Sequence, residues 1–320
     1  MTSTDRSFSE TYTAGVDLAA SPISTAVAVI EWSATSARVV ELVTPADDNQ
    51  IRELATGASR VGVDSPFGWP DEFVAFIAAH HRHRTPRESG LDAIDRRRPL
   101  VFRRTDRYLV EHGLGRPLSV SADQIAHVAF RCAGLLADLG VDDRVDGWAV
   151  EAYPAGALTQ WGLRSRGYKR SVNRVVLGEL VAQLIVAAPW LALGELRGLM
   201  EYDDNAFDAV ITALIARAAD LGHTHLPAAS DTQIATREGW IHVPTCPLDA
   251  LRPGGGGWSD CRGERLTNGT ATSTRSARRI HPLRRRGHVA SAGYVRGEAA
   301  LRWRWATPGD DRARPRWPGR

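Results

Sequence analysis

Three short apolar segments, far apart in the chain, end in the same pattern of a small residue, a valine and an acid. They are Gly15-Val16-Asp17, Gly62-Val63-Asp64 and Ala149-Val150-Glu151. Because side chains alternate along a strand, each acid shares a face with the small residue two positions before it. Neighbouring parallel strands lie about 4.8 Å apart, so three such strands would bring three carboxylates together at one sheet edge.

The segments around these strand ends predict one α/β domain over residues 11–250. Apolar residues at helical spacing indicate helices between and after the strands. Short links between the first three strands predict an antiparallel meander. We therefore predict an α/β fold with a mixed five-stranded sheet flanked by helices. The predicted strands are 12–20, 25–32, 37–43, 60–64 and 146–152, with a short final strand or hairpin at 239–243. The predicted helices are 47–56, 71–81, 122–139, 172–186 and 204–221, and residues 71–145 form a mostly helical insertion after the fourth strand.

Composition separates this domain from the two ends of the chain. Residues 1–10 are predicted to be a flexible N-terminus, and they lack the apolar stretch of a signal peptide. Residues 251–320 are rich in Arg, Gly and Pro and show no sustained hydrophobic periodicity, which favours a disordered tail. Sixteen arginines and five acids lie between Arg252 and Arg320. This tail is either a phosphate-binding segment or a solvated extension.

The overall composition favours a cytoplasmic protein with a packed core. Hydrophobic residues make up 43% of the chain, but no apolar run reaches the roughly 18 residues that a membrane span needs. The three cysteines, Cys132, Cys246 and Cys261, show no CxxC spacing, which argues against a zinc ribbon or a disulfide framework. Neither a Walker A motif nor G-x-G-x-x-G occurs, which argues against the common nucleotide-binding folds.

Acids gathered at one sheet edge repel each other, and a divalent cation relieves that repulsion. Oxygen ligands suit Mg²⁺ or Mn²⁺, and two such ions can hold the attacking and leaving oxygens of a phosphodiester. A further acid comes from the helix at 204–221, where Asp208 precedes a stripe of alanines that lets the helix approach the sheet. We predict catalytic and metal-binding roles for Asp17, Asp64, Glu151 and Asp208, with Asp204 as an additional metal ligand. The alternative is that the strand-end acids are turn residues and that Asp204 stabilises a helix N-terminus.

Two basic residues are candidates for substrate binding. Arg104, in the helical insertion, could bind a phosphate, although a surface ion-pair network explains it equally well. Lys169, after Gly167-Tyr168, could also contact a phosphate, or it could be a solvated loop lysine. The histidines at 80, 81 and 83 match no zinc-binding spacing and are interpreted as solvated.

The order of these motifs resembles the RNase H-like fold, with an Asp in the first strand, an acid in the fourth and another in a late helix. More specifically, the chain resembles the DUF429 family of predicted nucleases. The resemblance covers about residues 12–250 and does not include the tail. It is carried by Gly15-Val16-Asp17-Leu18-Ala19, Gly62-Val63-Asp64-Ser65-Pro66-Phe67-Gly68, Arg104-Thr105-Asp106, Glu151-Ala152-Tyr153-Pro154, Tyr168-Lys169 and Asp204 to Ala213.

The resemblance and the acids together imply a Mg²⁺- or Mn²⁺-dependent nuclease that cleaves phosphodiester bonds in DNA or RNA. One alternative is a non-catalytic binding protein with the same fold. The other is an ATP-binding relative of the sugar kinases, which would need a duplicated core and glycine-rich phosphate loops. The sequence predicts only one such core, so this alternative ranks last.

Overall fold

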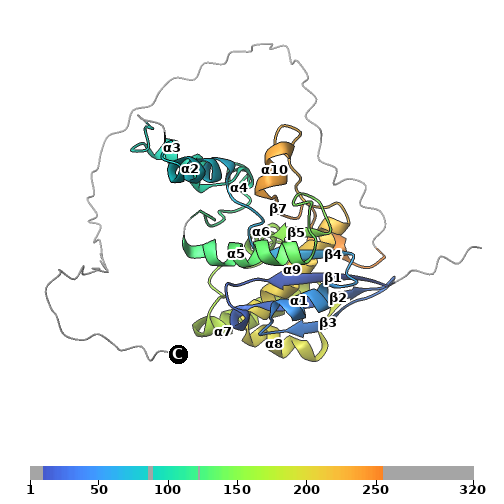
Figure 1. The fold of residues 1–320 in the computed structure, drawn as a ribbon. Helices are drawn as coiled ribbons and strands as arrows, with labels where there is room; N and C mark the ends of the chain where they lie inside the picture. Colours follow the sequence, from blue (N-terminus) through green and yellow to red (C-terminus); the bar gives the residue numbers. More distant parts are fainter. Residues whose placement is uncertain (1–9, 86–88, 122, 255–320) are drawn as a thin grey trace, which may run out of the picture. The chain divides into compact units, whose positions relative to one another are not determined.

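The computed structural model describes residues 10–85, 89–121 and 123–254 (Figure 1). Residues 255–320, nearly all of the predicted tail, lie outside the described residues, as does most of the predicted flexible N-terminus. Within the described part of the chain, we find no helix with the length and apolar character needed to cross a membrane.

The centre of the domain is a mixed sheet of seven strands, in the order β6-β3-β2-β1-β4-β5-β7. Strands β1, β2 and β3 form the predicted antiparallel meander. Strands β4, β5 and β7 continue from β1 in parallel, and β6 pairs in parallel with β3. The strands are β1 (Thr11–Asp17), β2 (Ala26–Trp32), β3 (Ala37–Val43), β4 (Arg60–Asp64), β5 (Ala149–Ala152), β6 (Leu191–Ala192) and β7 (Ile241–His242).

The prediction of a five-stranded sheet is therefore wrong in its strand number. The sheet gains β6 at one edge and β7 at the other, and each has only two residues. A period-two pattern cannot be recognised over two residues, so β6 has no signal in the sequence. The short strand expected at residues 239–243 corresponds to β7 and is confirmed.

Helices cover the sheet and fill the predicted insertion between β4 and β5. All five predicted helices occur, with ends that differ by a few residues at most. Two further segments of the insertion, Ile94–Val101 and Arg104–Glu111, are also helical and form α3 and α4. The helices are α1 (Asp48–Ala55), α2 (Asp71–His81), α3 (Ile94–Val101), α4 (Arg104–Glu111), α5 (Asp123–Asp138), α6 (Pro154–Gln160), α7 (Arg174–Ala187), α8 (Arg197–Tyr202), α9 (Asp204–Asp220) and α10 (Thr232–Glu238).

The two faces of the sheet pack against different helices. Helix α9 lies across β1, β2 and β4 and forms the larger core with α7 and α8. It comes so close because glycines replace side chains beneath it. A Cβ atom at Gly15 would overlap the α9 backbone, and one at Gly62 would lie 2.6 Å from the carbonyl oxygen of Thr212. Helices α1 and α5 cover the opposite face, where their apolar residues pack against Val16, Val61 and Val63.

Candidate carboxylate site

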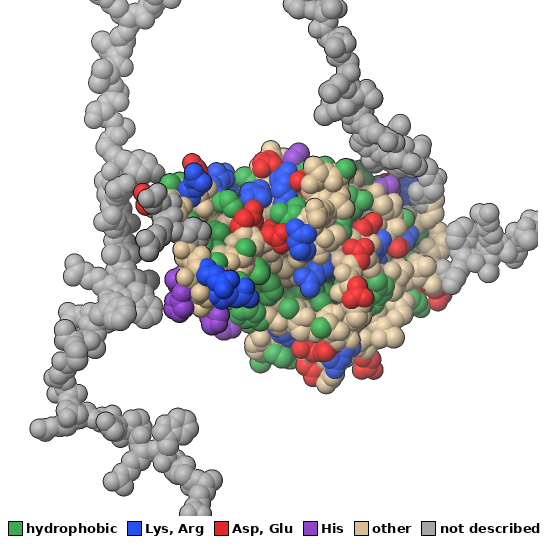
Figure 2. Space-filling model, turned by 45° about the horizontal axis from the view of Figure 1, so that its top comes forward, with side chains coloured by type: hydrophobic (Ala, Val, Ile, Leu, Met, Phe, Trp, Pro, Cys, Tyr) green, Lys and Arg blue, Asp and Glu red, His purple; other side chains and the backbone are tan. Residues whose placement is uncertain are grey.

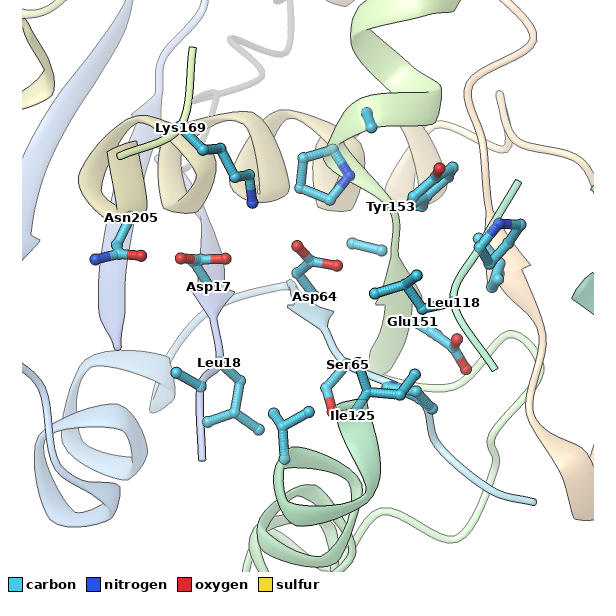
Figure 3. Close-up of a pocket in the computed structure, with 18 of the residues that line it drawn as sticks. Asp17, Leu18, Asp64, Ser65, Leu118, Ile125, Glu151, Tyr153, Lys169 and Asn205 are labelled. Atoms are coloured by element: carbon cyan, nitrogen blue, oxygen red, sulfur yellow. The ribbon is translucent and has the colours of Figure 1, made fainter. Parts of the chain in front are cut away.

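Asp17 and Asp64 lie side by side where β1 and β4 end. The two strands are parallel, and Asp17 is the register partner of Asp64, just as Gly15 is the partner of Gly62. Register partners point to the same face, so both carboxylates lie on the face that α9 covers. Asp17 is buried and Asp64 is half-buried. Figure 3 shows the two carboxylates next to each other in a pocket.

Asp208 reaches this site from α9. The helix starts where the Asp203 side chain accepts a hydrogen bond from the Asn205 N–H, which fixes the first turn. Asp208 follows one turn later and is fully buried. Its Oδ1 accepts a 2.8 Å hydrogen bond from the Tyr168 hydroxyl, and its Oδ2 lies 2.6 Å from Lys169 Nζ. Each oxygen of the Asp208 carboxylate therefore has one partner, the Tyr168 hydroxyl or the Lys169 ammonium group.

The electrostatics of the three acids reflect burial and mutual repulsion. Burial, followed by the nearby Asp208 charge, raises the pKa of Asp17 well above its usual value. Burial also raises the pKa of Asp64 to about 7, although the Lys169 ammonium opposes the shift. The pKa of Asp208 is raised by burial too, again against the effect of Lys169. Asp17 and Asp64 thus lack enough positive charge around them to be stable as a metal-free, fully ionised pair.

Glu151 is not brought onto this face. The β4–β5 register aligns it with Val63 rather than with Asp64, a shift of one residue that turns its side chain to the α5 side of the sheet. There it accepts two hydrogen bonds from the Arg103 guanidinium, at 2.7 and 2.8 Å, and one from the Phe67 N–H at 3.0 Å. The expectation that three strand-end acids share one face therefore fails for Glu151, and Figure 3 shows its carboxylate turned away from Asp17.

Arg103 is a buried residue beside the site, and it links Glu151 to Asp106. It is 1% exposed, and it also donates to both carboxylate oxygens of Asp106, at 2.9 and 3.2 Å. Burial alone would lower its pKa, but the adjacent Asp106 and Glu151 carboxylates outweigh that effect and raise it. A guanidinium held this way joins α4 to β5 and has no donor directed at a substrate. The separation of three residues between Arg103 and Asp106 was the only local signal of this pair.

The remaining predicted residues have other partners. Arg104 forms ion pairs with Asp231 and Glu111, as the surface-network alternative expects. Asp204 accepts a 3.2 Å hydrogen bond from the backbone N–H of Arg170. Lys169 binds Asp208, which neither the phosphate prediction nor the solvated-lysine alternative included.

A pocket of about 630 Å³ opens above the two aspartates. Its lining brings together charged groups from both faces at the sheet edge, including Asp17, Asp64, Glu151 and Lys169. Tyr153, at the start of α6, forms part of the opposite wall (Figure 3). The pocket is therefore large enough for a nucleotide-sized group and has carboxylates along its floor.

Within the described residues, no group of three or more His, Cys, Asp or Glu side chains is arranged to hold a metal ion. Two of the predicted acids already have other partners: Asp208 contacts Lys169 and Tyr168, and Glu151 pairs with Arg103. The pair that remains, Asp17 and Asp64, fits a hydrated Mg²⁺ ion, which is commonly held by one or two carboxylates together with water and phosphate oxygens. It does not fit the site of four or five acids and two ions that the sequence predicted.

These observations define a mixed α/β protein with a buried carboxylate pair at the carboxyl edge of its central strands. The family model described as "Protein of unknown function (DUF429)" matches residues 15–232, so the chain belongs to the DUF429 family. No curated protein and no solved structure was found to match the chain.

Proposed function

We propose that this protein is a divalent-cation-dependent phosphodiesterase that acts on nucleic acid, with an RNase H-like fold. The observation that carries the proposal is the in-register pair of the buried Asp17 and the half-buried Asp64 at a pocket floor, both with raised pKa values. The order of the acids, in β1, β4 and α9, supports the fold assignment. Such a pair is costly to bury unless it serves to attract a cation.

The residues of the chain would divide the work as follows. Asp17 and Asp64 hold the cation, and the pocket that they line leaves room beside them for a phosphate group. A bound Mg²⁺ or Mn²⁺ ion supplies Lewis-acid stabilisation of the phosphate and lowers the pKa of a water molecule. Arg103 holds Glu151 away from the pair and fixes the neighbouring strand β5.

The surface charge of the domain supports recognition of nucleic acid by individual side chains rather than by one continuous basic surface. On the face that Figure 2 shows, Lys and Arg side chains are interspersed with Asp and Glu side chains. A surface of mixed charge attracts a polyanion less strongly than a continuous basic one. We therefore expect weak binding of nucleic acid without a divalent cation.

The test is cleavage of end-labelled single- and double-stranded DNA and RNA with Mg²⁺, with Mn²⁺, and with a chelator. We expect cation-dependent cleavage that falls by at least about 100-fold in Asp17→Asn and Asp64→Asn, because Asn keeps the shape but removes the charge that holds the ion. Asp220→Asn is the matched control, because Asp220 ends the same helix α9 but pairs only with Arg217 and Ser59. A wild-type chain that cleaves none of the four substrates with either ion would refute the proposal.

A non-catalytic binding protein is the second candidate. The missing third acidic ligand among the described residues favours it. Binding measured by fluorescence anisotropy separates the two: this candidate predicts cation-dependent binding of nucleic acid that is never followed by cleavage.

A further inference from the structure

Lys169, the only lysine in the chain, is fixed against the carboxylate site by its neighbours. Residues 168–170 bind the start of α9 at three points: the Tyr168 hydroxyl and Lys169 Nζ contact Asp208, and the Arg170 N–H contacts Asp204. Arg170 adopts φ +77°, a left-handed conformation that costs a non-glycine residue energy and persists only where surrounding contacts enforce it. These contacts therefore hold the ammonium group of Lys169 beside the Asp208 carboxylate.

The charges around this ammonium group divide into two parts. Lys169 and Asp208 form an ion pair at 2.6 Å, with Asp208 fully buried, so the pair is neutral as a unit. Asp17 and Asp64, when both are ionised as in a metal complex, add two negative charges that this neutral pair does not balance. One divalent ion balances those two charges, whereas two divalent ions would leave a buried excess of positive charge beside Lys169.

We propose that Lys169 is a built-in counter-ion that stands in place of a second metal ion, so that the site takes a single divalent cation at Asp17 and Asp64. Asp208 is then the partner of Lys169 and not a metal ligand. This inference rests on the proposed function only in assuming that a divalent cation binds. Lys169 is then a positioning residue. It neutralises Asp208 through their ion pair and so fixes the net charge of the site.

The experiment is a charge-balance cycle on the full chain, with Mn²⁺ binding measured by isothermal titration calorimetry and by the loss of the free-Mn²⁺ electron paramagnetic resonance signal. We expect the wild type to bind one Mn²⁺. Removing the ammonium in Lys169→Met should tighten binding at least about tenfold, because a repelling charge is lost near the ion. Removing the carboxylate in Asp208→Asn should weaken binding at least about tenfold, because Lys169 is then unbalanced.

The double variant Lys169→Met/Asp208→Asn decides between the two roles of Asp208. If the two groups form a neutral pair, their joint removal returns the affinity to within about threefold of the wild type, whatever the single variants do. If Asp208 is a ligand, the double variant stays as weak as Asp208→Asn, and the inference is overturned. Lys169→Arg, which keeps the charge, should stay within about threefold of the wild type.

Stoichiometry and cleavage separate this inference from the proposed function. Two Mn²⁺ ions bound by the wild type would overturn the inference even if the protein cleaves nucleic acid. A protein with the expected affinity cycle that cleaves nothing would refute the proposed function and leave the inference standing. If neither the wild type nor Lys169→Met binds Mn²⁺, both are refuted. Thermal melts of each variant confirm folding, and the net-neutral double variant remains informative if a single variant unfolds.

Discussion

The two faces of the sheet treat their buried acids in opposite ways. On the α5 side, Glu151 and Asp106 share the guanidinium of Arg103 through short hydrogen bonds. On the α9 side, Asp17 and Asp64 lie side by side, and Lys169, whose charge acts on both, pairs with Asp208. Arg103 and Glu151 from the first group and Asp17 and Asp64 from the second line one pocket.

The difference separates structural acids from candidate functional ones. An acid that is fully hydrogen-bonded to a buried arginine is held in one position and gains little from a metal ion. An acid pair that is buried without such a partner costs stability, and proteins retain that cost mainly where a ligand relieves it. Glu151 and Asp64 both line the pocket, so it is the Arg103 contact of Glu151, and not its position, that distinguishes the two acids.

The largest effect on stability should come from removing Arg103, the cation shared by the acids on the α5 side. In Arg103→Met, Glu151 and Asp106 would lose their shared cation while remaining buried, and we expect the free energy of unfolding to fall by about 3–5 kcal/mol. Arg104→Met is the matched control, because the neighbouring Arg104 side chain is partly exposed and its ion pairs are worth less than about 1 kcal/mol. Urea denaturation followed by circular dichroism measures both. Equal losses in the two variants would show that the Arg103 network carries no special stability.

A smaller effect should come from altering the packing on the α9 side. A methyl group in Gly15→Ala would overlap the backbone of α9 at Ala209 and Ala213, so the helix must shift away from β1. We expect a loss of about 2–3 kcal/mol in the free energy of unfolding, together with weaker Mn²⁺ binding, since Asp17 follows on the same strand. Gly178→Ala in α7 is the control: a Cβ there meets nothing within 4 Å, and alanine favours a helix. A Gly15→Ala variant as stable as the wild type would mean that α9 packs less closely than the structure indicates.

Much of the fold could be predicted from the sequence, because its elements carry long patterns. The meander of β1 to β3 has short links, and α9 has an apolar surface over its whole length. The edge strand β6 depends on tertiary contacts over two residues, and no local pattern encodes it. The strand β7 was predicted as a short strand or hairpin, but its parallel pairing with β5 was not. The glycines at 15 and 62 identified the strands, but that they serve the close approach of α9 became clear only from the structure.

The site was predicted in part, and the reason lies in strand register. The repeated small–valine–acid pattern correctly placed Asp17 beside Asp64, because those strands pair in register. It misplaced Glu151, because β5 is shifted by one residue against β4 and alternation then reverses the face. The contact between Lys169 and Asp208 joins residues 39 positions apart and rests on the course of one loop, which no spacing rule predicts.

The smallest predicted effect is a pH dependence that belongs to the α9 side alone. The folded-state pKa of Asp64 is about 7, above the ordinary value of 3.8. The folded protein therefore binds more protons than the unfolded chain between these values, and the stability this contributes is present at low pH and lost as the pH rises towards 7. Asp17, Asp208 and Lys169 surround Asp64 on this face, and Glu151 lies nearby on the other side. Asp64→Asn removes the titration, so without metal its stability relative to the wild type should increase by about 1–2 kcal/mol between pH 5 and pH 8, less than the full shift implies because Asp64 is only half-buried. That corresponds to a few degrees in Tm for a domain of this size, and differential scanning calorimetry at both pH values with a chelator present measures it.

Adding Mg²⁺ at pH 8 should raise the Tm of the wild type but not that of Asp64→Asn, because only the wild type retains both charges. Parallel pH profiles for the two proteins would show that Asp64 is ionised without strain and that the contrast between the two faces is not electrostatic.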